Sequence, residues 1–371
     1  MEYRIETLDL AGGAAALQPW QLRGLAELER EHQLGLLGHD DFARDPAQIA
    51  AWSTNRSSVR RLIVLAREAT AGPVPGAIVG AAMMDLPLLD NTHMAWASVT
   101  VRAAHRRRGL GTALWREVWA ATREDGRTTV IADTAHLPAQ APAEHRVPPA
   151  TGTGYLDDRE GPTCFARTMG LALMQVERQS TQQLPIPADH LANLRTRATP
   201  AVGPDYDLVQ WTGATPPDLV PDYLRLLTAM STDAPMGDLD YHEEAWDAGR
   251  LLEAEQAAER AGRRSLTTAA RHLPSGALVG YTQIQLDTYK PQMAHQENTV
   301  VLRDHRGHRL GLLLKLANVE QLQRLAPQVR RVHTWNAAEN QHMLAVNTAL
   351  GYRLSSLWGA WQYQQTRAET P

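Results

Sequence analysis

The chain of 371 residues contains little of what marks several broad classes of protein. Its single cysteine, Cys164, excludes an intrachain disulfide and favours a reducing compartment. No apolar run approaches the length that spans a membrane, and the first residues lack the apolar core of a signal peptide. The net charge of −4 offers no broad basic surface for a nucleic acid. We therefore expect a cytoplasmic protein with neither a membrane nor a nucleic acid as partner.

The composition that is present is that of an ordinary globular chain, with 43% hydrophobic and 21% charged residues, enough for two cores. Apolar periodicity alternates between the strand and helix repeats. These patterns predict a mixed α/β layer architecture. In the first part of the chain, the expected elements are strand 3–10, helices 17–37 and 46–52, strands 61–67, 77–84 and 92–101, helix 109–123 and strand 128–133.

A basic, glycine-containing segment joins one of these strands to the following helix. Three arginines, Arg106 to Arg108, precede Gly109-Leu-Gly111 at the expected helix start. The first N–H groups of a helix have no intrahelical partner, and the positive end of its dipole favours an anion. Glycine lets the backbone approach that anion closely, and the arginine side chains match phosphate oxygens. The segment lacks the full Rossmann and Walker patterns, so it predicts a phosphate-binding loop of another kind.

The same pattern recurs two hundred residues further along, in residues 299–315. Arg306, Leu310 and Gly311 repeat Arg106, Leu110 and Gly111, and Val301 repeats Val101 at the same offset. A repeat at such a long period indicates two duplicated domains. One position differs, because Arg309 replaces Gly109. Its side chain is expected either to crowd the first phosphate and weaken the second loop, or to contact phosphate itself.

This arrangement resembles the pyrophosphate-binding loop of the GCN5-related N-acetyltransferase (GNAT) superfamily. The resemblance implies two fused domains, each a mostly antiparallel sheet with helices on both faces, and acetyl-CoA or another acyl-CoA as acyl donor. In the family, the strand's main chain pairs with the pantetheine arm, and the loop's amides hold the pyrophosphate. The N–H that follows Val101 or Val301 would polarise the thioester oxygen. The tandem layout resembles that of actinobacterial double-GNAT proteins, the group that includes mycothiol synthase.

A second family feature stands near the end of the chain, in residues 336–352. Asn336 closes a strand, Asn340 starts a helix, and the helix ends in Leu-Gly-aromatic. The family's tyrosine, which protonates the leaving thiolate, is replaced by Asn347, and in the first half by Ala166. Asn340 could also be a plain helix cap. The acyl-CoA contacts that the resemblance implies are Val99, Val101, Arg106, Arg107, Arg108, Gly109, Leu110, Gly111 and Thr112 in the first half, and Val301, Arg306, Gly307, His308, Arg309, Gly311, Asn336 and Asn340 in the second.

The prolines and glycines of the middle of the chain suggest the domain division. We expect a first domain over 1–184, a linker and helix over 185–204, and a second domain over 205–371. Residues 135–161 lack periodicity and are expected to form a long irregular insertion. An acidic loop at 231–240 would border the acceptor site and meet a cationic amine, although acidic loop residues are more often solvated.

Transfer of an acyl group to an amine needs a base that accepts the amine's proton. The candidates are Glu297 and His295 in the second half and His93 and Asp133 in the first. Of these, Glu297 is the predicted base. Asn347 is the second residue predicted to take part in catalysis. His305 and His308 lie in the phosphate loop without a zinc pattern, so we expect no metal.

The predicted function is an acyl-CoA-dependent N-acyltransferase, in which the amine of a small molecule attacks the thioester directly in a ternary complex. One alternative is a non-catalytic acyl-CoA-binding protein with one or both domains degenerate, because both halves lack the tyrosine. Another is a protein or peptide N-acetyltransferase. The sequence does not distinguish which half is active or how the chain assembles.

Overall fold

A computed structural model describes residues 2–54, 56–138, 140–233 and 235–364. The chain forms two compact units that exchange segments along the sequence. Unit 1 takes the described residues of 1–177, 237–241 and 356–371, and unit 2 those of 178–236 and 242–355. The boundaries expected from the sequence, 1–184 and 205–371, divide the chain without this exchange.

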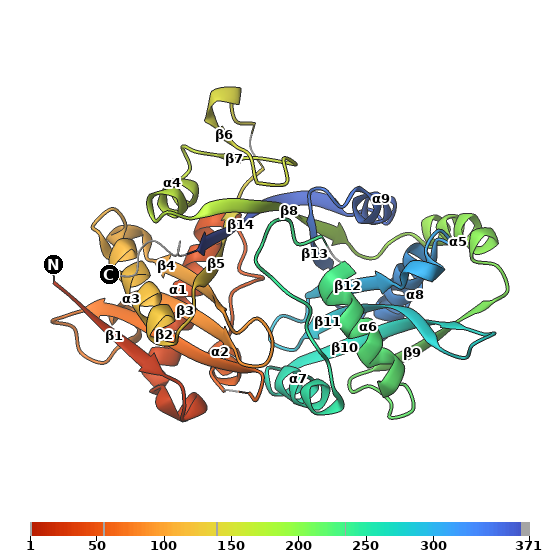
Figure 1. The fold of residues 1–371 in the computed structure, drawn as a ribbon, viewed down its shortest axis with the longest axis horizontal. Coiled ribbons are helices and arrows are strands. Elements are labelled where there is room, and N and C mark those ends of the chain that lie inside the picture. Colours follow the sequence, from red (N-terminus) through yellow and green to blue (C-terminus); the bar gives the residue numbers. More distant parts are fainter. Residues whose placement is uncertain (1, 55, 139, 234, 365–371) are drawn as a thin grey trace. The chain divides into compact units, whose positions relative to one another are not determined.

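Unit 1 is a mixed α/β layer structure (Figure 1). Its elements are β1 (Tyr3–Asp9), η1 (Gly13–Ala16), α1 (Pro19–Leu37), α2 (Pro46–Trp52), β2 (Val59–Glu68), η2 (Pro75–Ala77), β3 (Ile78–Pro87), β4 (Met94–Val101), η3 (Ala103–His105), α3 (Leu110–Glu124), β5 (Thr129–His136), η4 (Ala143–His145), β6 (Arg146–Val147), β7 (Leu156–Asp157) and α4 (Gly161–Thr168), with the start of β8 (Ala172–Gln183) and the end of β14 (Arg353–Gln364). Within the expected irregular insertion, β6 and β7 pair as a small hairpin-like sheet.

Local signals in the sequence explain where the first helices begin and end. Helix α1 has Pro19 at its first position and a reciprocal capping box between Gln18 and Gln21, and it ends at Gly38 in the left-handed conformation. Helix α2 starts after Asp45, whose side chain accepts a hydrogen bond from the N–H of Ala47.

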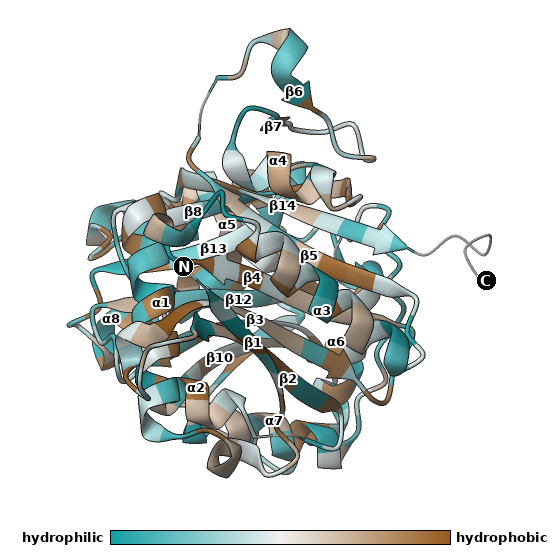
Figure 2. Cartoon of the chain, turned by 90° about the vertical axis from the view of Figure 1, so that its left-hand side faces the viewer, coloured by the Kyte–Doolittle hydropathy of each residue, from teal (hydrophilic) through white to brown (hydrophobic). Residues whose placement is uncertain are grey.

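The sheet of unit 1 is antiparallel through β1, β2, β3 and β4, after which β5 runs parallel to β4 and antiparallel to β14. The apolar stretch of β5 stands out in Figure 2. Successive side chains of β3 alternate between faces. Ala81 and Met83 pack in the core under α1 and α2, whereas Gly80 faces Leu114 of α3. Helices therefore cover both faces of the sheet, as expected.

Unit 2 repeats this order of elements (Figure 1). Its elements are the end of β8, α5 (Ala188–Val202), β9 (Tyr206–Thr212), α6 (Val220–Asp233), α7 (Ala248–Arg260), β10 (Arg263–His272), β11 (Leu278–Asp287), β12 (Met293–Val301), η5 (Arg303–His305), α8 (Leu310–Leu325), β13 (Arg331–Ala337), α9 (Gln341–Ala349) and the start of β14.

The sheet of unit 2 is antiparallel from β9 through β12, and β13 runs parallel to β12. One core lies between the sheet and α6 and α7, where Tyr223 and Leu226 pack with Tyr281. The other lies on the side of α5 and α8, where Leu316 packs with Ile284. Among the described helices of the chain, none combines the length and apolarity that crossing a membrane requires.

Candidate functional site

The strands β4 and β5 of unit 1 run side by side only at their beginning. Their parallel pairing covers Met94–Ala97 against Thr129–Ala132 and then stops. The N–H of Arg102 donates to Val79 O on β3, and the N–H groups of a strand alternate in direction. The N–H groups of Val99 and Val101 therefore point toward the gap that opens beside β5. These two main-chain donors are available to an extended ligand.

The gap belongs to a cavity of about 700 Å³, here called the unit 1 cavity. Its wall comes from α1, the end of β4, the start of α3, the middle of β5, α4 and β14. Of the residues predicted to contact acyl-CoA in this half, seven line it, and they are Val99, Val101, Arg106, Arg107, Gly109, Gly111 and Thr112. Leu110 instead lies in the core at 3% exposure, because its helical position faces the sheet.

The loop before α3 presents main-chain donors to this cavity. The first intrahelical hydrogen bond of α3 runs from Ala113 N to Gly109 O, so the N–H groups of Leu110, Gly111 and Thr112 precede the hydrogen-bonded turn. Arg107 and Gly109 have positive φ angles of 61° and 82°, which fold the loop tightly around these amides. The geometry is that of an anion site at a helix N-terminus.

Arg106 holds the loop to the end of β4. Its Nε donates to Val101 O at 2.9 Å, and its guanidinium contacts His32 Nδ1 at 3.2 Å. Burial and the charge of Arg106 lower the pKa of His32, so this neighbour is a neutral imidazole near pH 7. The charge of Arg106 therefore remains for an anionic ligand.

Asp133 of β5 also lines the unit 1 cavity. Its side chain is accessible to water but lies in a concave site crowded by protein atoms. The loss of surrounding water raises the pKa of its carboxyl to about 6. Asp133 is thus placed to exchange a proton near neutral pH, as the sequence suggested for one of four candidates.

Two residues of the cavity wall, Thr134 and Trp361, were missed by sequence reasoning, which ended the strand at residue 133. Strand β5 continues to His136 and brings Thr134 to the wall of the cavity. Trp361 of β14 reaches the same wall and donates from Nε1 to Thr134 Oγ1 at 2.8 Å. No local signal in the sequence pairs β5 with a strand more than two hundred residues away.

The predicted donor to the thioester oxygen is wrong. The N–H after Val101 belongs to Arg102 and donates to Val79 O, and the corresponding N–H of Leu302 donates to Val279 O. Both amides are held by sheet hydrogen bonds on the side away from the gap. Position 166, where the family tyrosine was expected, does line the unit 1 cavity as an alanine.

The loop before α8 follows the same backbone path as the loop before α3, but its glycine lies at a different position. Gly307 and Arg309 have φ angles of 86° and 56°, at the positions of Arg107 and Gly109. The side chain of Arg309 donates to Arg197 O of α5 at 2.9 Å. The N–H of Leu312 donates to Arg309 O at 3.1 Å, which removes one amide from the set available to an anion.

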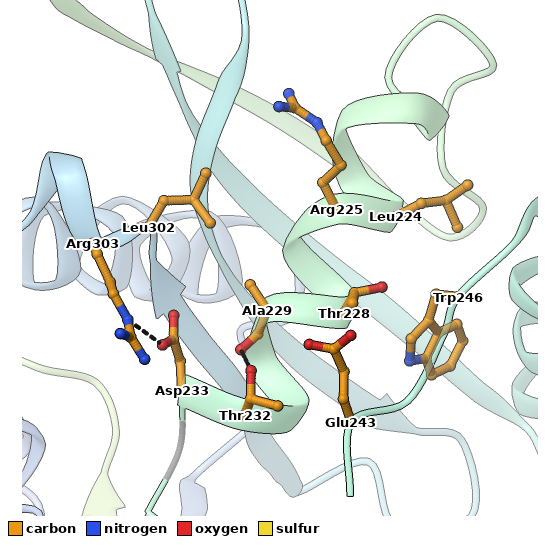
Figure 3. A pocket seen from close by; sticks show the side chains of 10 residues that line it. All are labelled: Leu224, Arg225, Thr228, Ala229, Thr232, Asp233, Glu243, Trp246, Leu302 and Arg303. Carbon is orange, nitrogen blue, oxygen red and sulfur yellow. Dashed lines mark hydrogen bonds and ion pairs between the residues drawn. The ribbon is translucent and has the colours of Figure 1, made fainter. Parts of the chain in front are cut away.

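A carboxylate neutralises the arginines of the second loop. Asp233, at the end of α6, accepts from Arg303 at 3.2 Å and from Arg306 at 2.8 Å, and its side chain is only 9% exposed. Figure 3 shows Arg303 and Asp233 facing each other at a cavity of about 520 Å³. This unit 2 cavity lies between α6, the residues before α7 and those after β12. A diphosphate here would compete with a built-in acidic partner.

Asn336 and Asn347 of the second unit belong to a largely buried polar network. Asn347 accepts from Lys315 Nζ at 2.6 Å and donates to Asn336 Oδ1 at 2.6 Å. Burial lowers the pKa of Lys315 to about 7, and its amine lies 5.4 Å from the ring centre of Tyr352. Asn340 accepts from Met343 N and so caps α9, which was the plainer reading of that residue.

Glu297, the predicted base, lies at an irregularity of β12. The register with β11 shifts between Thr282 and Ile284, so Glu297 and Asn298 oppose a single residue. Glu297 is accessible to water, and the surrounding protein raises the pKa of its carboxyl. It does not line the unit 2 cavity. Its catalytic role, like that of Asn347, stays a prediction.

The expected acidic loop divides between the two units. Asp240 contacts Thr129 Oγ1 and His93 Nε2, and its N–H donates to Gln362 Oε1, all within unit 1. Asp233 instead binds the arginines of the second loop. These acids therefore have structural partners in addition to any role near an acceptor.

Comparison with known proteins finds a family domain in the first half of the chain and similar folds over nearly all of it. Residues 25–145 match the model of the acetyltransferase (GNAT) family. The sequence matches none of the curated proteins with which it was compared.

Solved structures resemble the chain over its whole length. A tandem GNAT protein from the clavulanic acid biosynthesis pathway, solved without AcCoA, is 28% identical with a TM-score of 0.71, over 97% of this chain and 98% of that one. A GCN5-related N-acetyltransferase from Sphaerobacter thermophilus is 14% identical with a TM-score of 0.59, over 97% and 95% of the two chains. The second match shows the fold alone.

Proposed function

Since the chain is a tandem GNAT protein, with a family domain in its first half, we propose that it transfers an acyl group from acyl-CoA, most simply acetyl-CoA, to the amine of a small molecule. The unit 1 cavity is the proposed donor site. The observation that carries the proposal is the junction of β4, the loop and α3, where main-chain N–H groups, Arg106 and a large cavity meet.

Each part of the cavity has a role in this reaction. The amides of Gly111 and Thr112, with Arg106, would hold the diphosphate, and the N–H groups of Val99 and Val101 would pair with the pantetheine arm. The amine attacks the thioester carbon directly, and the bond from carbon to sulfur breaks. Asp133 is the proposed base, because it lines this cavity and its raised pKa suits proton transfer near neutral pH. It replaces Glu297 as the favoured candidate.

We propose that the second unit does not hold the diphosphate of acyl-CoA. The support is electrostatic and geometric, since Asp233 pairs with Arg303 and Arg306, and Arg309 binds the main chain of α5. A diphosphate at this loop would have to displace Asp233, whose side chain is only 9% exposed, from both arginines. The proposed acceptor is an amine of specialised metabolism, a suggestion supported by the neighbour from the clavulanic acid pathway.

Calorimetric titration of the full chain with acetyl-CoA tests the donor site. We expect one binding site per chain. Arg106→Gln should weaken binding by about 10- to 100-fold, the loss of one charge-assisted phosphate contact. Gly111→Asp should abolish binding, because even a Cβ there lies 3.2 Å from the ring of Phe165 and the carboxylate repels the diphosphate.

The second loop supplies the matched controls. Arg306→Gln and Gly311→Asp should leave the affinity unchanged, and a Cβ at Gly311 meets nothing within 4 Å. An absence of binding to the unmodified chain would refute the donor proposal. Two sites, or equal losses from both sets of variants, would refute its assignment to unit 1.

A further inference from the structure

A hydroxyl, an imidazole and a carboxylate form a hydrogen-bonded chain beside the unit 1 cavity. Thr134 Oγ1 lies 2.7 Å from His136 Nε2, and His136 Nδ1 is hydrogen-bonded to Glu160 Oε2. Thr134 lines the cavity and is partly exposed, whereas His136 is only 2% exposed. Glu160 is held at the start of α4, where it occupies the N-cap position. Two elements of the fold, β5 and the start of α4, thus supply the three groups of this chain.

The chemistry of the partners fixes the proton positions. An ionised carboxylate only accepts hydrogen bonds, so Nδ1 of His136 carries the proton that Glu160 receives. In the neutral imidazole, Nε2 is then the acceptor, and the Thr134 hydroxyl donates to it. Burial lowers the pKa of His136 despite the opposing effect of Glu160, so the neutral base form prevails at pH 7.

The hydrogen bonds of the Thr134 hydroxyl leave one lone pair of its oxygen for a reaction. Trp361 Nε1 donates to Thr134 Oγ1 at 2.8 Å and occupies one lone pair. The hydroxyl proton points to His136, which leaves the second lone pair for a bond to carbon. A nucleophile bonded to a base, and the base bonded to an orienting carboxylate, is the arrangement of enzymes that form acyl intermediates.

We infer that Thr134 accepts the acyl group from acyl-CoA and that the chain hydrolyses acyl-CoA through this ester when no amine is bound. The inference rests on the proposed function, since it requires an acyl thioester in the unit 1 cavity. It adds a second acceptor, Thr134 itself, to direct transfer to an amine.

The reaction needs no reagent beyond acyl-CoA and water. Thr134 Oγ attacks the thioester carbon while its proton passes to His136 Nε2, and the imidazolium is stabilised by Glu160. The bond from carbon to sulfur breaks, and His136 returns the proton to the thiolate, which gives CoA and an acyl-threonine. Water then attacks the ester with His136 as base, and the products are a carboxylic acid and the regenerated hydroxyl.

The experiment incubates the full chain with acetyl-CoA in the absence of any amine. Thiol release is measured, and samples quenched in acid are examined by mass spectrometry with peptide mapping. Hydroxylamine traps an ester that turns over too quickly to accumulate. We expect one acetyl group on Thr134, or acetyl hydroxamate with the trap, together with thiol release at a steady rate.

Variants separate a reactive network from one that only ties α4 to β5. Thr134→Val keeps the shape and should abolish the adduct and the thiol release without amine, whereas Thr134→Ser should retain both. His136→Gln should slow this release by about 10²- to 10⁴-fold, the usual contribution of a general base. Calorimetry with acetyl-CoA on each variant establishes that the cavity is intact.

Two outcomes overturn the inference in distinguishable ways. If the unmodified chain binds acetyl-CoA but gives no adduct, no hydroxamate and no thiol release beyond that of Thr134→Val, the inference fails and the proposed transferase function stands. If the unmodified chain does not bind acetyl-CoA, the proposed function fails and the inference fails with it.

Discussion

At the scale of single residues, the two units place ionisable side chains with shifted pKa values in different surroundings. Asp133 is a carboxyl that lines the unit 1 cavity, and its pKa, raised to about 6, gives it a proton to exchange near that pH. Lys315 is an amine enclosed by the second unit, and its pKa is lowered to about 7. Both shifts come from burial, but only Asp133 lies on a cavity large enough for a substrate.

The pH dependence of transfer tests the role of Asp133. Only the deprotonated carboxylate accepts the proton of the amine, so the rate of thiol release should rise as pH increases through about 6. Asp133→Asn should lower the turnover number with the best acceptor of an amine panel by about 10²- to 10⁴-fold, while acetyl-CoA still binds. An Asn variant with the original pH profile would exclude Asp133 as the base.

Lys315 predicts a pH dependence of stability. Between about pH 7 and its ordinary value of 10.5, the amine is deprotonated in the folded protein and protonated in the unfolded chain. The unfolded state binds more protons in this window, so the stability contributed at this position grows with pH, by at most about 1.4 kcal/mol per pH unit. Urea unfolding at pH 7, 8 and 9 should show this slope in the unmodified chain but not in Lys315→Met. Parallel slopes would contradict it.

Sequence reasoning at this scale located residues that follow a local pattern, and the structure places them at the unit 1 cavity. The loop residues Arg106, Gly109 and Gly111 were found because an anion site at a helix start needs only neighbours in sequence. The hydrogen bond between His136 and Glu160 joins residues on different elements. The ion pair between Asp233 and Arg306 joins residues 73 positions apart in the sequence. No sequence period encodes such contacts.

At the scale of elements, the two phosphate loops show that one backbone path tolerates two placements of glycine. Each loop has two residues in the left-handed region, and each has glycine at only one of them. A left-handed arginine costs about 1 kcal/mol relative to glycine. The sequence alone pointed to the missing glycine at Arg309, and it could not show that Gly307 compensates at a different position.

Helix α1 offers a matched pair of glycines for a test of packing. A Cβ at Gly24 would lie 2.7 Å from Pro75 O and from Ile78 Cδ1, whereas a Cβ at Gly35 meets nothing within 4 Å. Gly24→Ala should destabilise the protein by about 1–3 kcal/mol through overpacking, although alanine is the better helix former. Gly35→Ala should stabilise it by about 0.5–1 kcal/mol. Thermal unfolding of both variants decides, and similar shifts in the same direction would contradict this packing.

At the scale of the whole molecule, each unit is built from segments that are distant in the sequence. This composition determines which fragments of the chain can fold on their own. Strand β5 of unit 1 pairs with Leu357–Gln364 of β14, and Trp361 from that strand is buried at the unit 1 cavity. The order of helices and strands in each half was predictable, because each half repeats one pattern of apolar residues. The exchange was not, since edge pairing between strands far apart in sequence leaves no periodic signal.

Expression of residues 1–184 alone tests this dependence. The fragment exposes the edge of β5 and loses a buried tryptophan, whose removal typically costs about 3–5 kcal/mol, comparable to the whole stability of a domain. We expect no cooperative unfolding transition for it. A fragment in which residues 353–364 follow through a short linker should regain the transition and bind acetyl-CoA. A stable, cooperative fragment 1–184 would contradict the expectation.

The position of β14 in the sequence also affects how the protein folds during its synthesis. The residues of β14 that pair with β5 follow every other described strand in chain order, so β14 emerges from the ribosome after those strands. One edge of β5 therefore stays unpaired until β14 has been synthesised. The more than two hundred residues between β5 and β14 thus set how long the exposed strand edge can pair with another chain before the sheet closes.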